Sequence, residues 1–173
     1  GIGRLATGRI PNEGASTLTQ QLLKNNVFTT WTQENQLDRV KRKVQEQFLA
    51  LQLEANLTKE GKDTKSVILE NYLNTINLGA GTYGVQTASY KYFDKSVSEL
   101  TLSECAVLAA IPQNPTAFNP IIHPDNNAER RAKVLRNMLD QGYISQSEYE
   151  EALADKVYDR IAQAQEKQDQ KDS

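Results

Sequence analysis

The chain has 173 residues, of which 38% are hydrophobic, and its 20 Lys and Arg against 22 Asp and Glu give a formal net charge of −2. This length suffices for one sizeable core, and no apolar run approaches the roughly 20 residues that a membrane-spanning helix needs. Such a balance gives no sign of the strong basic excess of many nucleic-acid-binding proteins, so we expect no nucleic acid partner.

The charges are distributed unevenly along the chain. Residues 1–46 hold seven Lys and Arg against four Asp and Glu, whereas residues 140–173 hold four against nine. The basic excess includes a cluster at Arg39, Lys41, Arg42 and Lys43. An anionic ligand is therefore expected at the N-terminal part, and the acidic end is predicted to be a solvated helix or a linker.

The first expected helix spans about residues 16–26 and follows the run Gly14-Ala15-Ser16-Thr17-Leu18-Thr19-Gln20-Gln21-Leu22-Leu23-Lys24-Asn25. Ser16 or Thr17 can cap it, and Thr17-x-x-Gln20 has the spacing of a capping box. A helix N-terminus offers free N–H groups and a positive dipole to a phosphate. Lys24 lies about two turns further on, so the run predicts a phosphate site, with an ordinary capped surface helix as the alternative.

The second expected helix spans about residues 35–57, and placing its residues at about 100° each separates two faces. One stripe consists of Leu37, Val40, Val44, Phe48 and Leu51, which predicts the core face. Glu46 lies roughly opposite, among further apolar residues, and is expected to line a cleft. Arg42 and Lys43 precede it by four and three residues and could hold it ionised or share an anion with it. An ordinary intrahelical ion pair is the alternative.

The rest of the chain also reads as helices joined by turns, and no alternating apolar pattern indicates a strand, so the predicted fold class is all-α. Ser66 is expected to cap a helix that Gly79 closes, and residues 79–84 are expected to form a flexible turn into a helix over 85–93. Capping boxes at Thr101-x-x-Glu104 and Ser145-x-x-Glu148 open two later helices, and the prolines between positions 112 and 124 predict an ordered loop.

Four groups of residues together resemble the peptidoglycan glycosyltransferase domain, glycosyltransferase family 51, of bifunctional class A penicillin-binding proteins. The motif G-x-S-T-x-T-Q-Q-L-x-K is matched by Gly14 to Lys24, and R-K-x-x-E with a later L-E by Arg42, Lys43, Glu46, Leu53 and Glu54. The motif I-L-E-x-Y-L-N, with glycines and Y-F, is matched by Ile68, Leu69, Glu70, Tyr72, Leu73, Asn74, Gly79, Gly84, Tyr92 and Phe93. The last is matched by Leu102, Glu104, Ala106, Leu108, Ala109, Pro112, Pro115 and Pro120.

The resemblance implies a lysozyme-like helical fold and an enzyme that joins lipid II units into glycan strands at the extracytoplasmic face of the bacterial cell membrane. The acceptor sugar's 4-hydroxyl would attack the donor's anomeric carbon and expel undecaprenyl pyrophosphate. The implied partners are lipid II, the growing glycan strand and moenomycin-type inhibitors, with membrane association through the parent chain.

The resemblance also assigns roles to residues. Glu46 would be a catalytic carboxylate near the diphosphate and a possible ligand of a divalent cation, Mg²⁺ or Mn²⁺, although the sequence requires no cofactor. The expected substrate and pyrophosphate contacts are Ser16, Thr17, Gln21, Lys24, Asn25, Arg42, Lys43, Glu70 and Asn74. Glu70 and Asn74 could equally be scaffold polar groups that satisfy the backbone.

One family motif, E-D-x-x-F-x-x-H-x-G, has no match before Gly14, where Glu13 is the only acidic residue. That motif carries the general base of the family, and a general base typically contributes about 10²–10⁴ in rate. We therefore expect residues 1–158 to be part of a transglycosylase domain with little or no activity alone. Residues 159–173 are expected to be a polar acidic linker towards a transpeptidase domain.

Two other function classes remain open from the residues. A lysozyme-like enzyme that cleaves peptidoglycan would share the helices and an acidic residue, but it would have no use for Lys24 together with Arg42 and Lys43. A non-catalytic helical interaction module would explain the caps and apolar stripes, but it would not require polar Thr17, Gln21 and Lys24 on one helix.

Overall fold

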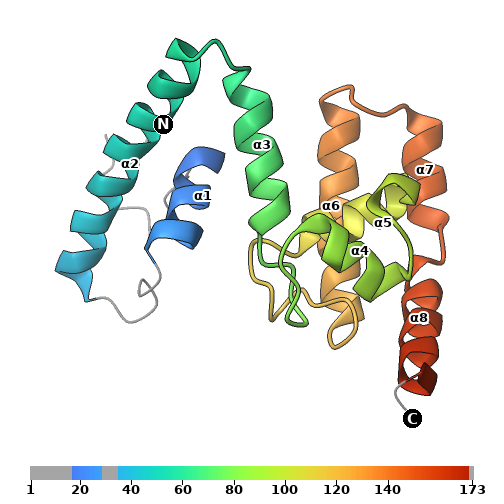
Figure 1. Ribbon diagram of the computed structural model, residues 1–173. Helices are drawn as coiled ribbons and strands as arrows, with labels where there is room; N and C mark the ends of the chain where they lie inside the picture. The colour runs from blue at the N-terminus through green and yellow to red at the C-terminus, as the bar shows by residue number, and fades with distance from the viewer. Residues whose placement is uncertain (1–16, 29–34, 172–173) are drawn as a thin grey trace. The chain divides into compact units, whose positions relative to one another are not determined.

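The computed structural model describes residues 17–28 and 35–171, and throughout these ranges the chain is built from helices and turns (Figure 1). The helices are α1 (Leu18–Val27), α2 (Gln36–Lys59), α3 (Thr64–Thr75), α4 (Val85–Phe93), η3 (Val97–Glu99), α5 (Leu102–Ala110), α6 (Pro124–Asp140), α7 (Gln146–Ala154) and α8 (Val157–Lys171). Within the described ranges the sole β-type pairing is an isolated bridge between Asn77 and Tyr83. The predicted all-α fold class is confirmed. The chain divides into two compact units, residues 1–69 and 70–173, and the boundary in the sequence falls within α3.

The helix starts follow local side-chain chemistry. Capping boxes form at Thr17, Thr101 and Ser145, as their spacing predicts. The prediction for α3 is wrong in its cap, because the carboxylate of Asp63 accepts from the backbone N–H of Ser66 at 3.4 Å and from its hydroxyl at 2.6 Å. An Asp side chain that precedes a helix accepts from N–H groups one turn on, so the helix begins earlier, at Thr64. Ser16 lies outside the described residues.

In the first unit, α1 packs against α2. Thr19 is 3% exposed, and its hydroxyl donates to the Glu54 carboxylate at 2.6 Å, which ties the two helices together. The face of α2 that is buried carries Arg42, Glu46 and Ala50. The polar side of this helix therefore faces its helical neighbour.

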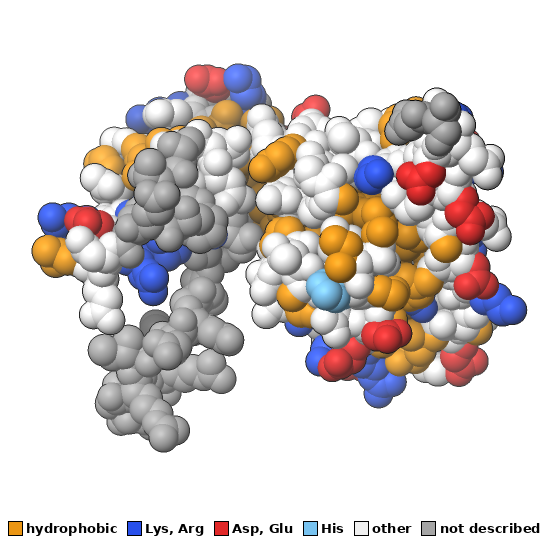
Figure 2. All heavy atoms as spheres, turned by 90° about the horizontal axis from the view of Figure 1, so that it is seen from below, with side chains coloured by type: hydrophobic (Ala, Val, Ile, Leu, Met, Phe, Trp, Pro, Cys, Tyr) orange, Lys and Arg blue, Asp and Glu red, His pale blue; other side chains and the backbone are white. Residues whose placement is uncertain are grey.

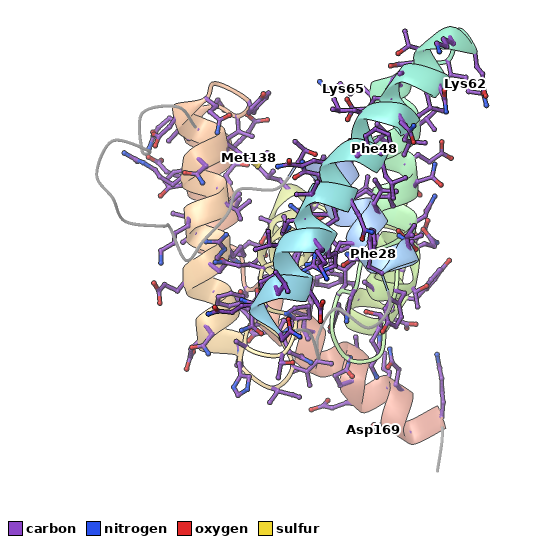
Figure 3. The ribbon with its side chains drawn as sticks, turned by 90° about the vertical axis from the view of Figure 1, so that its left-hand side faces the viewer. Phe28, Phe48, Lys62, Lys65, Met138 and Asp169 are labelled. Atoms are coloured by element: carbon purple, nitrogen blue, oxygen red, sulfur yellow. The ribbon has the colours of Figure 1, made fainter. Side chains whose placement is uncertain are left out.

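The predicted core face of α2 is wrong for the described structure. Its members are all between 60% and 69% exposed: Leu37, Val40, Val44, Phe48 and Leu51. Figure 3 labels Phe48 on this helix. An amphipathic pattern shows that two faces differ, but it does not say which face meets a neighbour. In this unit the side chains that α1 presents to α2 are polar or cationic, and they pack against the face of α2 that carries Glu46.

In the second unit, α5 packs on α6, α6 on α7, and α4 on α8. A core cluster joins α5, α6 and α7 through Ala106, Leu135, Ile144 and Ala152. On α8, the side chains of Val157, Ile161 and Ala164 are at most 3% exposed. The helix α8 is therefore packed into this unit, although most of it lies in the segment predicted as a linker.

Polar groups fix α8 to the rest of the unit. The amide of Gln165 donates to the carbonyl of Lys91 at 2.8 Å, and that of Gln168 donates to the carbonyls of Tyr90 and Lys91 at 3.2 and 3.1 Å. The last carbonyls of a helix have no partner within it, and α8 donates to that of Lys91, while the carbonyl of Tyr90 also accepts from the N–H of Asp94. Most of residues 159–173 thus form a docked helix, and a connection to a further domain stays a prediction.

A buried carboxylate joins three parts of the same unit. Glu104 is 0% exposed, and it pairs with Lys95 at 2.7 Å and with Arg160 of α8 at 2.9 Å. It also accepts from the backbone N–H of Thr101 at 2.8 Å. Burial by itself raises the pKa of Glu104, but hydrogen bonds from Lys95, Thr101 and Arg160 outweigh it and lower that pKa. The folded unit therefore favours the ionised form of Glu104.

Over the described ranges, no helix combines the length and the apolar character that spanning a membrane requires.

Candidate functional site

The candidate site lies in the first unit, where α1 and α2 bring charged side chains together. Glu46 is 0% exposed and Arg42 is 5% exposed, so both are buried in the face of α2 towards α1. Arg42 Nη1 donates to Glu46 Oε1, and Lys43 Nζ lies 2.8 Å from Glu46 Oε2. Each carboxylate oxygen of Glu46 thus has its own cation.

This geometry follows from spacing within one helix. Residues three and four apart lie on the same face, so Arg42 and Lys43 reach Glu46 from the preceding turn. The side chain of Lys43 remains 42% exposed, whereas that of Glu46 is 1% exposed. The pairing predicted from sequence is confirmed, and solvent reaches the cluster at Lys43.

Lys24 of α1 belongs to the same electrostatic cluster. Partial burial lowers the pKa of Lys24, and repulsion from Lys43 and Arg42 lowers it further, while attraction to Glu46 acts in the opposite direction. Such mutual effects require that these side chains lie near one another. The structure therefore places Lys24 within electrostatic range of Arg42, Lys43 and Glu46.

A bound anion would interact favourably with the cations of this cluster. Removing an ammonium from water and placing it near two other cations destabilises its charged form, as the lowered pKa of Lys24 shows. A phosphate or diphosphate placed there would reverse both effects through charge-assisted hydrogen bonds. The arrangement is therefore suited to binding an anion and to stabilising negative charge that develops in a reaction.

The other residues predicted on α1 occupy different environments. Gln21 is half-buried one turn before Lys24, whereas Asn25 is exposed near the end of the helix. The hydroxyl of Thr17 accepts from the N–H of Gln20 at 3.2 Å in the capping box. Thr17 also lines a small pocket of about 230 Å³ with residues that include Gln20, Gln47 and Glu54. In the structure, Thr17 therefore serves as the N-cap of α1.

Glu70 and Asn74 belong to the second unit. They lie one turn apart on α3, and both are exposed. Their exposure argues against the alternative that they are buried scaffold groups. Whether they contact a substrate stays a prediction.

Sequence reasoning did not single out the contact between Thr19 and Glu54, which sets α1 against α2 at 2.6 Å. Both residues lie within the matched motifs, at T-x-T-Q-Q and L-E. The sequence signal for this contact was a hydroxyl on the inner face of a short helix and a carboxylate on the neighbouring helix. Because 35 residues separate them, spacing alone could not pair them.

Both carboxylate oxygens of Glu46 are paired with cations, so a divalent ion would have to displace at least one of these pairs. Mg²⁺ is often held by one or two carboxylates together with substrate phosphates, so a role of Glu46 as a metal ligand beside a diphosphate stays a prediction. No group of three or more His, Cys, Asp or Glu suited to a metal occurs among the residues that the structure describes. The chain's single histidine, His123, is exposed on the second unit (Figure 2).

Comparison with known proteins places this geometry in a family. The family described as Transglycosylase matches residues 2–139. Penicillin-binding protein 1F of Bacillus subtilis is 47% identical over 144 residues, which cover 83% of this chain and 18% of that protein. Penicillin-binding protein 1A of Aquifex aeolicus is 45% identical over 146 residues, covering 84% of this chain and 18% of that protein.

A solved structure agrees with these matches. The crystal structure of penicillin-binding protein 1A from Haemophilus influenzae is similar with a TM-score of 0.52 and 47% identity, covering 60% of this chain and 15% of that one. The likeness confirms the expected lysozyme-like helical fold. The chain spans less than a fifth of the length of each of these three proteins. By the extent of the match and the identity, the chain belongs to the transglycosylase family.

Proposed function

We propose that this chain is part of a peptidoglycan glycosyltransferase that polymerises lipid II into glycan strands and releases undecaprenyl pyrophosphate. The observation that carries the proposal is the pairing of Arg42 and Lys43 with the buried carboxylate of Glu46, with Lys24 of α1 in electrostatic range of the three. Membership in the transglycosylase family supports the reaction class. The cluster supports the kind of leaving group.

The chemistry of the transfer explains why cations are needed. The 4-hydroxyl oxygen of the acceptor sugar forms a bond to the donor's anomeric carbon, while the bond from that carbon to the diphosphate oxygen breaks. The electron pair of the broken bond goes to the diphosphate, and the proton of the hydroxyl goes to a base. Cations that are already in place stabilise the developing charge without rearranging during the reaction.

Each member of the cluster has a proposed role in this step. Lys24 and Lys43 would contact the diphosphate oxygens, and Glu46 would keep Arg42 and Lys43 in position between turnovers. The ion pair of Arg42 is buried, so its guanidinium is held in one orientation. Gln21, Thr17 and Asn25 on α1, and Glu70 and Asn74 on α3, are proposed to order the donor.

The same function implies a place in the cell and a class of inhibitor. A lipid-linked substrate lies in a membrane, so we propose that the parent protein acts at the extracytoplasmic face of the bacterial cell membrane. A phosphoglycolipid such as moenomycin carries a phosphate and a saccharide, and it would compete for the same cations.

Titration of the purified chain with inorganic pyrophosphate, followed by calorimetry, tests the proposal. We expect saturable binding that weakens as salt is added, because ionic screening acts on partly exposed charges. The Lys24→Ala and Lys43→Ala variants should each raise the dissociation constant about tenfold, the effect of losing one charge-assisted hydrogen bond.

Lys41→Ala is the matched control. Lys41 lies on the same helix, its side chain is 66% exposed, and it pairs with Asp38 at 3.9 Å. Its loss should leave pyrophosphate binding unchanged within about twofold, because exposed pairs contribute little. Equal weakening in all three variants would indicate non-specific attraction to a basic surface. Preference of the wild-type chain for neutral glycan with no binding of pyrophosphate would favour a lysozyme-like hydrolase.

A further inference from the structure

The loop of residues 77–84, between α3 and α4, has an unusual backbone (Figure 1). Four of its residues have positive φ: Gly79 at 75°, Ala80 at 49°, Gly81 at 74° and Gly84 at 82°. Glycine adopts this conformation at no steric cost, but alanine does not. Strain of this kind persists only where the surroundings fix the backbone, and it is frequent at functional sites.

Hydrogen bonds close this loop upon itself. The N–H of Leu78 donates to the carbonyl of Thr82 at 3.0 Å, that of Thr82 to Gly79 at 2.8 Å, and that of Gly84 to Ile76 at 2.9 Å. The hydroxyl of Thr82 also donates to the carbonyl of Gly79 at 2.7 Å. The turn that the sequence predicted to be flexible is therefore held in one conformation.

Tyr92 fixes the loop to α4. This residue is 0% exposed, and its hydroxyl donates to the carbonyl of Leu78 at 2.6 Å. Burial raises the pKa of Tyr92 to about 12, so the hydroxyl keeps its proton and remains a donor. A Cβ on Gly79 would lie 2.9 Å from the carbonyl oxygen of Pro115 and 3.1 Å from the Tyr92 hydroxyl. The loop is thus held between α4 and the proline-rich segment.

The fixed loop presents one aromatic ring to solvent. Thr82 and Gly84 are buried, whereas Tyr83 between them is 63% exposed. The isolated bridge to Asn77 holds the backbone of Tyr83 in place. An aromatic side chain on a rigid backbone loses little conformational entropy when it binds a ligand.

The loop also adjoins a residue of the predicted donor pocket. A Cβ on Gly84 would lie 2.5 Å from the carbonyl oxygen of Asn74, so the loop packs directly against the end of α3. Glu70 lies one turn before Asn74 on the same helix. Tyr83 therefore follows a segment whose polar side chains are proposed to order a sugar-containing substrate.

We propose that the loop of residues 77–84 is a preformed saccharide-contacting element, in which the ring of Tyr83 stacks on a sugar and Tyr92 is the positioning residue. The proposal rests on the proposed function, since that function supplies a saccharide substrate. The flat apolar ring of tyrosine matches the C–H face of a pyranose, and its hydroxyl can exchange hydrogen bonds with the sugar's polar rim. Tyr92 acts through the Leu78 carbonyl and does not touch the ligand.

Titration of the purified chain with a soluble β-1,4-linked tetramer of N-acetylglucosamine, followed by NMR, tests the proposal. We expect the Tyr83 ring signals to shift with the saccharide, and Tyr83→Ala to raise the dissociation constant about three- to tenfold. Tyr143→Ala is the matched control, because Tyr143 is 74% exposed on the turn between α6 and α7. That variant should bind as the wild type does.

Tyr92→Phe separates positioning from general stability. The ring of the variant still fills the core, but the carbonyl of Leu78 loses its hydrogen-bond donor. Amide exchange at Thr82 and Gly84 should therefore become faster. Saccharide binding should weaken even at temperatures far below the unfolding temperature. A lowered unfolding temperature with unchanged binding would overturn the positioning role. Unchanged binding in Tyr83→Ala would overturn the contact.

A parallel titration with pyrophosphate keeps the two proposals distinguishable. If the wild-type chain binds pyrophosphate but not the saccharide, the inference about the loop fails and the proposed function stands. Saccharide binding without pyrophosphate binding would instead contradict the diphosphate site.

Discussion

Each of the two units buries one glutamate and pairs it with two cations, but the two arrangements differ. The cations of Glu46 come from its own helix, and Lys43 among them is 42% exposed. The cations of Glu104 come from two other segments, and one of them, Arg160, also pairs with Asp155 at 2.6 Å. The charge of Lys24 acts on the cluster around Glu46 from another helix. A similar ion pair thus ties segments together in one unit and is proposed as part of a binding site in the other.

The packing around the two glutamates also differs. Glu104 lies in a unit with a core that includes Ala106 and Leu135, which are 2% and 0% exposed. The described part of the first unit leaves large apolar side chains of α2 exposed, Phe48 among them at 60%. Local helical spacing therefore suffices to build a cluster of charges, while a tertiary network requires a packed core.

The largest effect is expected from Glu104→Ala. The variant leaves Lys95 and Arg160, whose side chains are 29% and 39% exposed, without their shared carboxylate, and the loss of these charged hydrogen bonds should cost about 2–3 kcal/mol of unfolding free energy. Urea unfolding followed by circular dichroism measures it. The control is Glu129→Ala, which removes an exposed pair with Lys133 and should change stability little. A small effect in both variants would show that Glu104 does not tie α8 to its unit.

Acid should weaken the second unit, as an intermediate effect. The pKa of Glu104 lies below 4.5, and Arg160 lowers that of Asp155 below 3.8. A lowered folded-state pKa stabilises above the unfolded-state value and is lost as the pH falls through the folded-state value. Stability should therefore hold from neutral pH to about 5 and decline below 4.5. Hydrogen exchange in α5 and α8 measures this. A Glu104→Gln variant with the same acid dependence would contradict the assignment.

The smallest effect is expected from Phe48→Ser. Because the side chain is 60% exposed, its replacement should change the unfolding free energy by no more than about 0.5 kcal/mol. Leu135→Ala, at a site that is 0% exposed, should cost about 2–5 kcal/mol in the same denaturation experiment. A loss for Phe48→Ser as large as that for Leu135→Ala would show that a partner covers this face of α2 in solution.

Local features were predictable from the sequence, and tertiary ones were not. Thr17, Thr101 and Ser145 could be recognised as caps because their partners lie three residues away. The pairing of Glu46 with Arg42 and Lys43 followed from helical spacing for the same reason. Lys24 was predicted from the first helix as part of a phosphate site, and the family motifs grouped it with Arg42 and Lys43 on another helix.

The failures have a common physical cause. The stripe containing Val44 was assigned to the core because it is apolar, but both faces of α2 contain apolar residues, so pattern could not decide which one meets α1. The pair of Glu104 with Arg160 spans 56 residues, so it has no local signature. The glycines at 79–84 indicated conformational freedom, yet their positive φ angles are fixed by hydrogen bonds and by Tyr92.

The docking of α8 has a practical consequence for anyone who prepares this domain. The family match ends at residue 139, before α7 and α8 begin. A chain cut at residue 139 would lack Arg160, which pairs with Glu104. It would also lack Gln165 and Gln168, whose amides donate to carbonyls at the end of α4. The shortest piece that keeps these contacts therefore runs through Lys171, well past the end of the family match.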